Sequence, residues 1–525
     1  MTGHLALILH AHLPFVRHPD QAGVLEEDWL FEAMTESYIP LLAVMRRLNA
    51  DGVPFKLTMT VTPTLCAMLN DPLLRQRYEQ HLDRGIKLTQ RELERTKQNA
   101  QLQALAQFYL EYLTECRRIF VEEMRRDLIS AFRALRESGS LEIIASAATH
   151  GLLPLLQQSP RAARAQVLIG CDVYRENFGA DPDAFWLPEC AFSPGLENIL
   201  QEANLRWFVL DAHGLLFGNP RPRHSIYYPC YTPAGPAAYA RDRASSRQVW
   251  SAHEGYPGDP DYREFYSDIG FELPVPHLWP GSDEQKTRRF TGLKYHRVTG
   301  RVPDKELYDH AAARRRAEEH ALHFFEARRR QFDEVSTHHP APIVVTPFDA
   351  ELFGHWWFEG PHFLEAFIRR AAAPDSNFRL TTPSRYLAEH PTQQTIAPAA
   401  SSWGEHGHLA VWIDHTNSWI YPHLHASARR MIEVAHAHAE EAPPLADRTL
   451  KQMARELLLM QSSDWAFLMK TGTARDYATK RTAEHIIRFN KLYDQLMDHQ
   501  VDETFLTDCE GRDNLFPNVN WRYYI

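Results

Sequence analysis

The sequence predicts an α/β fold built around a parallel sheet or barrel, followed by a helical C-terminal region. Short apolar runs alternate with charged, helix-like stretches, which is the pattern of parallel strands connected by helices. The runs that we expect to be strands are Leu5–Leu9, Phe55–Val61, Leu141–Ala145, Phe185–Leu187, Trp207–Leu210 and Ile343–Thr346. Several of them end in polar residues. In such folds the functional groups gather at the carboxyl ends of the strands.

Two parts of the chain lack strand signals and predict helices. Residues 66–138 are charged and too long for a structureless connection, so we expect a helical insertion between two strands. After the segment TQQTIAPAASS, residues 392–402, apolar residues recur at helical spacing. We therefore expect a catalytic domain at 1–395, which contains the insertion, and a helical domain at 396–525. The Gly-, Pro- and Tyr-rich stretch 228–280 predicts a long loop of the kind that forms lids.

Composition excludes several classes of protein. The 525 residues include 57 basic and 67 acidic side chains, a net charge of −10, which argues against nucleic acid as a partner. The N-terminal segment MTGHLALILHAHLPF lacks a basic region, and histidines interrupt its apolar run, so it predicts neither a signal peptide nor a membrane span. The six cysteines are scattered without a CxxC motif, which indicates reduced thiols and favours a cytoplasmic location.

The segment PFDAELFGHWWFEG, residues 347–360, concentrates acids and tryptophans directly after the apolar run IVVT. Its acids are Asp349, Glu351 and Glu359, and its paired tryptophans are Trp356 and Trp357. Packing alone does not explain three acids beside paired tryptophans at a strand end. Taken singly, each acid is as well explained as a helix cap or an ion-pair partner.

A second segment, AFWLPECAF at residues 184–192, places Glu189 directly after an aromatic, apolar strand. Two carboxylates from different strands are what glycosidic bond chemistry requires, because one attacks the anomeric carbon and the other transfers the proton. Aromatic walls raise the pKa of the acid, and aromatic rings pack against the apolar faces of sugars. The two segments therefore predict a carbohydrate-active enzyme that uses Glu189 and an acid of the first segment.

The motif HAHLP, residues 10–14, favours a competing interpretation. His10 and His12 lie on the same face at a strand end, where two imidazoles can ligate zinc. Candidate further ligands are His150, Asp211, His213 and Asp349. The sequence contains neither HExxH nor a compact Cys/His set, so a metal-dependent hydrolase such as a deacetylase is the less favoured interpretation.

Trp403, Trp412 and Trp419 open the helical region within residues 401–425. Such tryptophans form the walls of a sugar groove above the strand ends, or they hold two domains together. The sequence leaves both interpretations open.

Together the motifs resemble glycoside hydrolase family 57, and within it the 1,4-α-glucan branching enzymes. The resemblance extends over essentially the whole chain, and the third and fourth motifs are highly specific. The five motifs are HAHLP (10–14), GSLEIIASAATH (139–150), WLPECAF (186–192), TPFDAELFGHWW (346–357) and SSWGEHGH (401–408). The resemblance implies an incomplete seven-stranded (β/α) barrel with a helical insertion and a C-terminal helical domain. It also implies that no cofactor and no catalytic metal is needed.

By this resemblance Glu189 is the nucleophile and Asp349 the general acid/base of a retaining enzyme that cleaves α-1,4-glucan. Their carboxyl groups should then lie about 5–5.5 Å apart. Water as the acceptor gives hydrolysis, a 4-hydroxyl gives disproportionation, and a 6-hydroxyl gives an α-1,6 branch. Retaining α-amylases and 4-α-glucanotransferases share the carboxylate pair and remain alternatives. A non-catalytic glucan-binding protein is a further alternative, against which the intact pair argues.

The resemblance also implies a set of substrate-binding residues. His10, His12 and His150 would hydrogen-bond the sugar at the point of cleavage. Tyr239, in the long loop, would cap the active site and keep water out. The other matches are Arg263, Trp279, Gly281, Trp403, Trp412 and Asp464, the last of which would reach the substrate from the helical domain.

Overall fold

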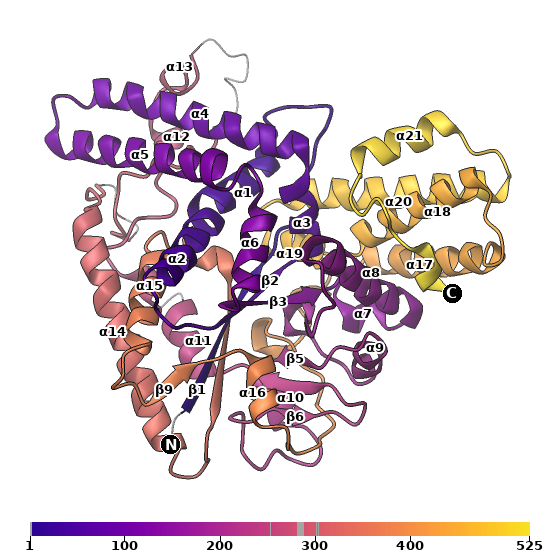
Figure 1. The fold of residues 1–525 in the computed structure, drawn as a ribbon. Coiled ribbons are helices and arrows are strands. Elements are labelled where there is room, and N and C mark those ends of the chain that lie inside the picture. The colour runs from indigo at the N-terminus through magenta and orange to yellow at the C-terminus, as the bar shows by residue number, and fades with distance from the viewer. Residues whose placement is uncertain (1–2, 252–253, 281–287, 301, 303) are drawn as a thin grey trace.

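A parallel sheet that curls into a barrel forms the centre of the molecule (Figure 1). The computed structural model describes residues 3–251, 254–280, 288–300, 302 and 304–525. Within these residues the strands follow the order β7-β5-β4-β3-β2-β1-β8, and a bridge between Arg241 and Val345 brings the last strand back to the first. The parallel strands are β1 (Gly3–Ala11), β2 (Leu57–Val61), β3 (Leu141–Ser146), β4 (Ala184–Trp186), β5 (Trp207–Leu210), β7 (Ala237–Ala240) and β8 (Ile343–Asp349). The predicted incomplete seven-stranded (β/α) barrel is confirmed.

Two short strands extend this sheet. β6 (Cys230–Tyr231) runs antiparallel to β7, and β9 (Phe378–Leu380) runs parallel to the first residues of β1. All six predicted strands are present. β6 and β7 instead lie in the stretch 228–280 that was predicted to be a loop, so part of this stretch belongs to the barrel wall.

The inside of the barrel is a packed core. Trp186 from β4, Trp207 from β5 and Tyr239 from β7 fill it, and all three are fully buried. Ile8 and Val345 pack against them from β1 and β8. Because these buried rings fill the barrel, no channel for a substrate runs through it. A substrate has access only at the ends of the strands.

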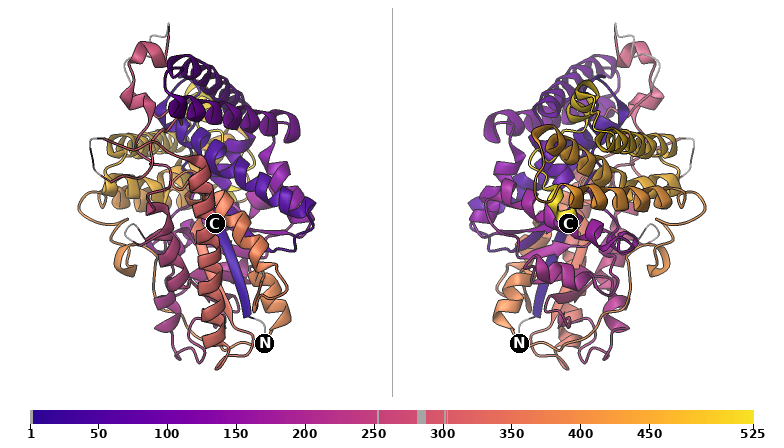
Figure 2. Two further views of the ribbon diagram at one scale, coloured as in Figure 1. Left: turned by 90° about the vertical axis from the view of Figure 1, so that its left-hand side faces the viewer. Right: turned by 90° about the vertical axis from the view of Figure 1, so that its right-hand side faces the viewer.

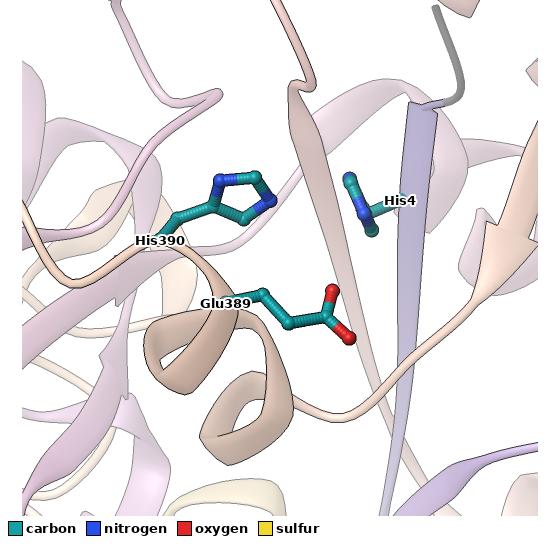
Figure 3. A group of neighbouring side chains, drawn as sticks. All are labelled: His4, Glu389 and His390. Atoms are coloured by element: carbon teal, nitrogen blue, oxygen red, sulfur yellow. The ribbon is translucent and has the colours of Figure 1, made fainter.

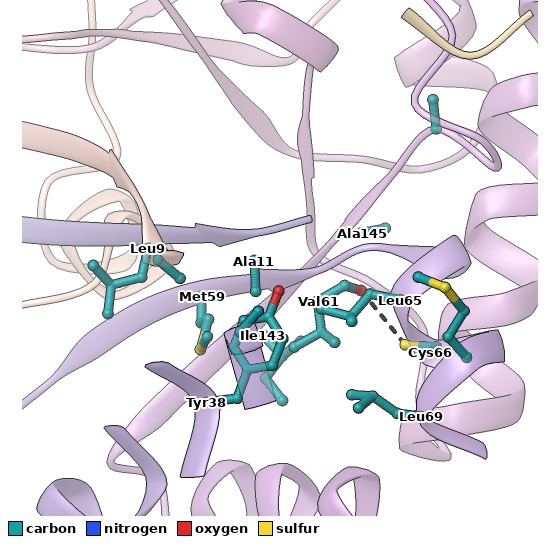
Figure 4. Close-up of a cluster of buried hydrophobic side chains, with 14 of the residues drawn as sticks. Leu9, Ala11, Tyr38, Met59, Val61, Leu65, Cys66, Leu69, Ile143 and Ala145 are labelled. Atoms are coloured by element: carbon teal, nitrogen blue, oxygen red, sulfur yellow. Dashed lines mark hydrogen bonds between the residues drawn. The ribbon is translucent and has the colours of Figure 1, made fainter. Parts of the chain in front are cut away.

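The outer face of the sheet is covered by helices. Figure 4 shows side chains of β1, β2 and β3 packed against Tyr38, Leu65 and Leu69. The Cys66 thiol donates a hydrogen bond of 3.6 Å to the carbonyl oxygen of Val61, which ties helix α3 (Pro63–Asn70) to the end of β2. The remaining helices around the barrel are α1 (Leu25–Ala33), α2 (Ile39–Ala50), α7 (Leu153–Leu156), α8 (Pro160–Phe178), α9 (Leu196–Glu202), α10 (Ala212–Leu216), α11 (Arg243–Trp250), α14 (His310–Val335), α15 (Gly360–Ala371) and α16 (Pro383–Glu389). The short helices α12 (Ile269–Glu272) and α13 (Val275–Leu278) lie next to the helical insertion instead (Figure 1).

The stretch predicted as a helical insertion is helical. It contains α4 (Pro72–Arg95), α5 (Ala100–Arg118) and α6 (Leu128–Glu137). Asp71 accepts a hydrogen bond from the backbone N–H of Leu74, and Pro72 occupies the first turn, so α4 has both signals of a helix start. α4 and α5 form a hairpin at one end of the molecule, and the chain begins at the opposite end (Figures 1 and 2). The predicted domain boundaries remain predictions.

Five helices follow residue 419 and gather on one side of the barrel (Figures 1 and 2). They are α17 (Ile420–Ala437), α18 (Pro444–Met460), α19 (Ser463–Thr471), α20 (Arg475–Met497) and α21 (Glu503–Arg512). α18 packs against α17, α20 and α21, and α19 packs against α20. Among the described residues, no helix combines the length and the apolar character that a membrane crossing needs.

Candidate active site

The carboxyl ends of four strands bring the predicted catalytic residues together. His10 near the end of β1 pairs in register with Asp349, the last residue of β8. His150 follows β3, and Glu189 follows β4 in a short 3₁₀ turn. His150 and Glu189 have φ of 56° and 61°, which side chains other than glycine adopt at a cost in free energy. Such strained backbone is typical of functional sites.

Hydrogen-bond donors surround Glu189. The indole N–H of Trp403 donates to Oε2 at 2.8 Å, and the Ser463 hydroxyl donates to Oε1 at 3.2 Å. Burial raises the pKa of Glu189 to about 7, although the bond from Trp403 and the charge of His12 oppose that rise. The donors stabilise the ionised carboxylate, which is the form that can attack an anomeric carbon.

Asp349 has acidic neighbours instead. Burial raises its pKa well above the usual range, the charges of Glu351 and Glu189 add to the rise, and only Arg241 opposes it. The raised pKa favours the protonated form of Asp349, which is the form that can donate a proton. Glu189 thus has two hydrogen-bond donors on its carboxylate, whereas Asp349 has acidic neighbours that disfavour its ionisation.

Glu351 is a third acid at this site. It accepts hydrogen bonds from the Tyr38 hydroxyl and, at 3.1 Å, from the backbone N–H of His12. Burial raises its pKa to about 7. Because its charge contributes to the raised pKa of Asp349, Glu351 favours the protonated form of that carboxyl group.

Three imidazoles form a stack next to the carboxylates. The rings of His12 and His150 lie 3.8 Å apart, and the ring of His10 stacks on Trp186 at 4.5 Å. His12 Nε2 lies 3.0 Å from a carboxylate oxygen of Asp464. Burial opposes the charged form of His12, but Asp464 outweighs it and raises the pKa of His12. Burial lowers the pKa of His10 and of His150 well below the usual range, so these two rings are neutral hydrogen-bonding groups.

His12, His150 and Asp464 lie close enough together to hold a metal ion. However, every ring nitrogen of the two histidines already has a protein partner. The partners are Thr62 and Asp464 for His12, and Ser463 and His10 for His150, at 2.9 to 3.2 Å. This arrangement fits a hydrogen-bond network better than the metal centre of a deacetylase-like hydrolase.

A second possible metal group lies at the opposite end of β1, where His4, Glu389 and His390 face one another (Figure 3). The guanidinium of Arg379 donates a hydrogen bond of 3.0 Å to His4 Nε2 and also bonds Glu389. The positively charged guanidinium of Arg379 therefore already lies where a metal ion would bind. A divalent cation would have to displace it, so we assign the group no metal.

The helical region completes the active site. The backbone N–H of Trp403 donates to the carbonyl oxygen of Glu189 at 3.0 Å, and the N–H of Ser463 donates to that of His150 at 3.2 Å. Trp403 is also packed edge-on against Trp186 at 5.1 Å. Trp403 thus lies next to Glu189 and Asp464 next to His12, although both residues follow Glu189 by more than 200 positions in the chain.

The prediction that Tyr239 caps the active site is wrong. Tyr239 lies in β7, is 1 % exposed, and donates a hydrogen bond of 2.8 Å to the carbonyl oxygen of Pro383. Its ring packs edge-on against Trp207 inside the barrel. Arg241, two residues further on and therefore on the same face of the strand, lies over the ring of Trp403 at 5.5 Å. The residue of this segment that reaches the site is Arg241.

Arg263 also differs from its predicted role. Its side chain is 2 % exposed and pairs with Glu36 at 2.7 Å, while the guanidinium stacks over Phe358 at 4.0 Å. A guanidinium held in a buried ion pair is not available to a sugar, so we correct the expectation of a substrate-contacting arginine.

Trp412 and Trp279 do not contact the carboxylates, and Gly281 lies outside the described residues. Trp412 is 2 % exposed and packs under Gly404, where a Cβ atom would approach its ring to 2.6 Å. Trp412 therefore supports the segment that joins the barrel to the C-terminal helices, residues 401–419, which we call the hinge. It does not form the wall of an open groove. Trp279 follows α13, and Arg289 lies over its ring at 6.0 Å.

Four residues of the site were not predicted: Tyr38, Arg241, Glu351 and Ser463. Glu351 stands in a segment that the sequence singled out, two residues after Asp349. Ser463 directly precedes Asp464, and Tyr38 and Arg241 carry no signal of their own.

A buried pair of carboxylates with aromatic neighbours, at the carboxyl ends of barrel strands, defines a class of enzymes that act on glycosidic bonds. Residues 6–398 match the model of glycosyl hydrolase family 57, and residues 423–524 match the model named 1,4-alpha-glucan branching enzyme, C-terminal. The chain therefore belongs to glycosyl hydrolase family 57.

Relatives with known names support this assignment. A 1,4-alpha-glucan branching enzyme of Thermococcus kodakarensis is 33 % identical, over 99 % of this chain and 78 % of that protein. The crystal structure of an alpha-amylase, AmyC, from Thermotoga maritima matches with a TM-score of 0.93 and 41 % identity, covering 100 % of this chain and 99 % of that one. The GH57-type branching enzyme of Pyrococcus horikoshii matches with a TM-score of 0.89 and 34 % identity, covering 100 % and 97 %.

Proposed function

We propose that this protein is a 1,4-α-glucan branching enzyme, which cleaves an α-1,4-glucan and transfers the released segment to a 6-hydroxyl group. The observation that carries this proposal is the match of residues 423–524 to the C-terminal region of branching enzymes, behind a family 57 catalytic region. The branching enzyme of Thermococcus kodakarensis, aligned over nearly the whole chain, supports the same activity. The substrate is then an amylose-like or glycogen-like polymer.

The proposed mechanism retains the anomeric configuration. Glu189 attacks the anomeric carbon while Asp349 protonates the departing glycosidic oxygen, which yields a covalent glycosyl-enzyme. Asp349, now ionised, then takes the proton of the acceptor hydroxyl, and the new glycosidic bond releases Glu189. The donors on Glu189 and the acidic neighbours of Asp349 support this division of roles. A separation of about 5–5.5 Å between the two carboxyl groups is expected.

The remaining side chains of the site orient the sugar in this mechanism. The neutral rings of His10 and His150 are suited to hydrogen-bond hydroxyl groups, and the ion pair of His12 with Asp464 holds His12 in place. We place the enzyme in the cytoplasm. The six cysteines support that location, because all are buried and unpaired thiols.

Incubation of the pure protein with amylose tests the proposed activity. Proton NMR counts the α-1,6 linkages, and a reducing-end assay run in parallel counts hydrolysis. We expect α-1,6 linkages to rise while reducing ends barely increase, and we expect Glu189→Gln to abolish both. A rise in reducing ends without branches would instead assign the activity of an amylase, in line with the likeness to the Thermotoga maritima enzyme.

A further inference from the structure

Two tryptophans form a stacked pair on the surface beside the catalytic strand. Trp250, the last residue of α11, is 36 % exposed, and Trp356 is 40 % exposed. Their ring centroids lie 5.6 Å apart with an interplanar angle of 29°. Large aromatic surfaces left in contact with water mark binding sites, because their burial contributes more free energy than that of most other side chains.

Trp356 lies in the loop after β8, and Trp250 lies on a helix that packs against β8, the strand that ends in Asp349. Trp356 follows that residue by seven positions, and its backbone N–H donates a hydrogen bond of 3.2 Å to the carbonyl oxygen of Glu351. Helix α11 packs against β8, and the N–H of Asp242, just before the helix, donates to the carbonyl oxygen of Val345 at 2.8 Å. The pair therefore lies beside β8, and Trp356 stands in the loop that follows Asp349.

The loop that carries Trp356 is held firmly. Gly354 has a φ of 127°, and it lies against the helical turn that precedes α2. A Cβ atom at this position would come within 1.8 Å of the carbonyl oxygen of Glu36. His355 Nδ1 bonds the Glu36 carboxylate at 2.8 Å, and its backbone N–H donates to the Ser37 hydroxyl at 3.0 Å. A surface fixed in this way loses little entropy when a ligand binds.

Packing does not require Trp356 itself. The neighbouring Trp357 is 1 % exposed and anchors the loop against Phe363 at 4.8 Å and Tyr262 at 5.5 Å. Trp356 is instead 40 % exposed, and its ring contacts that of Trp250. Trp357 thus holds the loop in place, whereas Trp356 leaves an aromatic face exposed.

We propose that Trp250 and Trp356 form an outer glucan subsite, which binds a glucosyl unit of the polymer beyond the one at the scissile bond. The apolar C–H face of a glucopyranose ring fits an aromatic platform, and a platform in the loop after Asp349 would hold the chain near the end of that strand. This inference rests on the proposed function, because it takes α-1,4-glucan as the ligand.

Calorimetric titration of maltoheptaose and maltose into the Glu189→Gln protein tests the subsite without turnover. With Trp356→Ala added, we expect the affinity for maltoheptaose to fall about 3- to 10-fold and the affinity for maltose to stay unchanged, because only the longer ligand reaches the rim. Trp356→Phe should restore most of the affinity. Phe217→Ala, at an aromatic side chain that is 62 % exposed and outside the pair, is the matched control and should change neither value.

Equal affinity of the Trp356→Ala and parent proteins for maltoheptaose would overturn the subsite. So would an altered sedimentation coefficient with unchanged affinity, because the pair would then be an interface between copies of the chain. Trp250→Ala provides a second variant if Trp356→Ala fails to fold. An absence of α-1,6 linkages in the amylose experiment would reject the branching function alone, since the binding titration does not depend on the linkage formed.

Discussion

The indole N–H of Trp403 donates a hydrogen bond of 2.8 Å to Oε2 of Glu189. Trp403 belongs to the segment before the C-terminal helices, whereas Glu189 lies in the short 3₁₀ turn after barrel strand β4. The bond favours the ionised carboxylate and opposes the rise in pKa that burial causes. The reactivity of the predicted nucleophile is therefore adjusted by a residue outside the barrel.

Trp403→Phe keeps an aromatic ring but removes this donor. We expect the pKa of Glu189 to rise, so that the acid limb of kcat/KM against pH moves upward by about one pH unit. Trp412→Phe is the matched control, because Trp412 lies in the same hinge without a bond to Glu189. An unchanged acid limb in Trp403→Phe would show that the bond does not adjust the carboxylate.

The acid limb in the pH profile of the parent enzyme should lie at an unusually high pH. In the proposed mechanism Glu189 must be ionised to attack, and burial raises its pKa to about 7, so we expect kcat/KM to rise with pH up to that value. Activity falls at higher pH as Asp349 loses the proton that its acidic neighbours help to retain. Initial rates on maltooligosaccharides measured from pH 4 to pH 10 test this. A profile that is flat from pH 5 to 7 would contradict the buried environment of Glu189.

Glu189→Gln should stabilise the protein at alkaline pH. Folding raises the pKa of Glu189 from 4.5 to about 7, so the parent loses stability as pH rises through that window. Gln does not ionise, and the variant should gain at most about 3 kcal/mol at pH 8 and nothing at pH 4. Urea unfolding at both pH values measures the difference.

Asp464→Asn should have the opposite effect on stability and should destabilise the protein at neutral pH. Although burial opposes it, the charge of His12 lowers the pKa of Asp464 from 3.8 to about 2, so its stabilising effect is present above pH 3.8 and disappears as pH falls toward 2. Removing the charge should cost up to about 2 kcal/mol at pH 7. A variant as stable as the parent at pH 7 would show that the ion pair makes no net contribution.

Tyr239→Phe should affect stability and leave the product distribution unchanged. The substitution removes the buried hydrogen bond to the carbonyl oxygen of Pro383, at a cost of about 1–2 kcal/mol. The ratio of α-1,6 linkages to reducing ends, measured by NMR, should equal that of the parent. A shift toward reducing ends at unchanged stability would return Tyr239 to the role of a cap over the active site.

The apolar patterning was sufficient to predict most of the barrel. Strands such as Trp207–Leu210 are buried on both faces, so they appear in the sequence as uninterrupted apolar runs. Ala237–Ala240 was missed because it is short, consists mainly of alanine and follows a Gly-Pro pair, which is typical of a loop. Its strand conformation comes from pairing with β5, a contact between distant segments that local sequence does not encode.

The site was predicted where a chemical group stands at a strand end within a motif, as for Glu189 and Asp349. The errors concern residues whose role depends on burial. Arg263 and Trp412 are of the right type to bind sugars, but tertiary packing encloses both. Tyr38 and Ser463 were missed because only the folded chain brings them to the carboxylates.

The sharing of the site between the barrel and residues after 400 has a consequence during synthesis. Ser463 and Asp464 dock on His150 and His12, so a growing polypeptide on the ribosome lacks two partners of its carboxylates and imidazoles until most of the chain has emerged. The barrel would be translated long before it could act. The site is therefore completed only after the C-terminal helices have been translated and have docked.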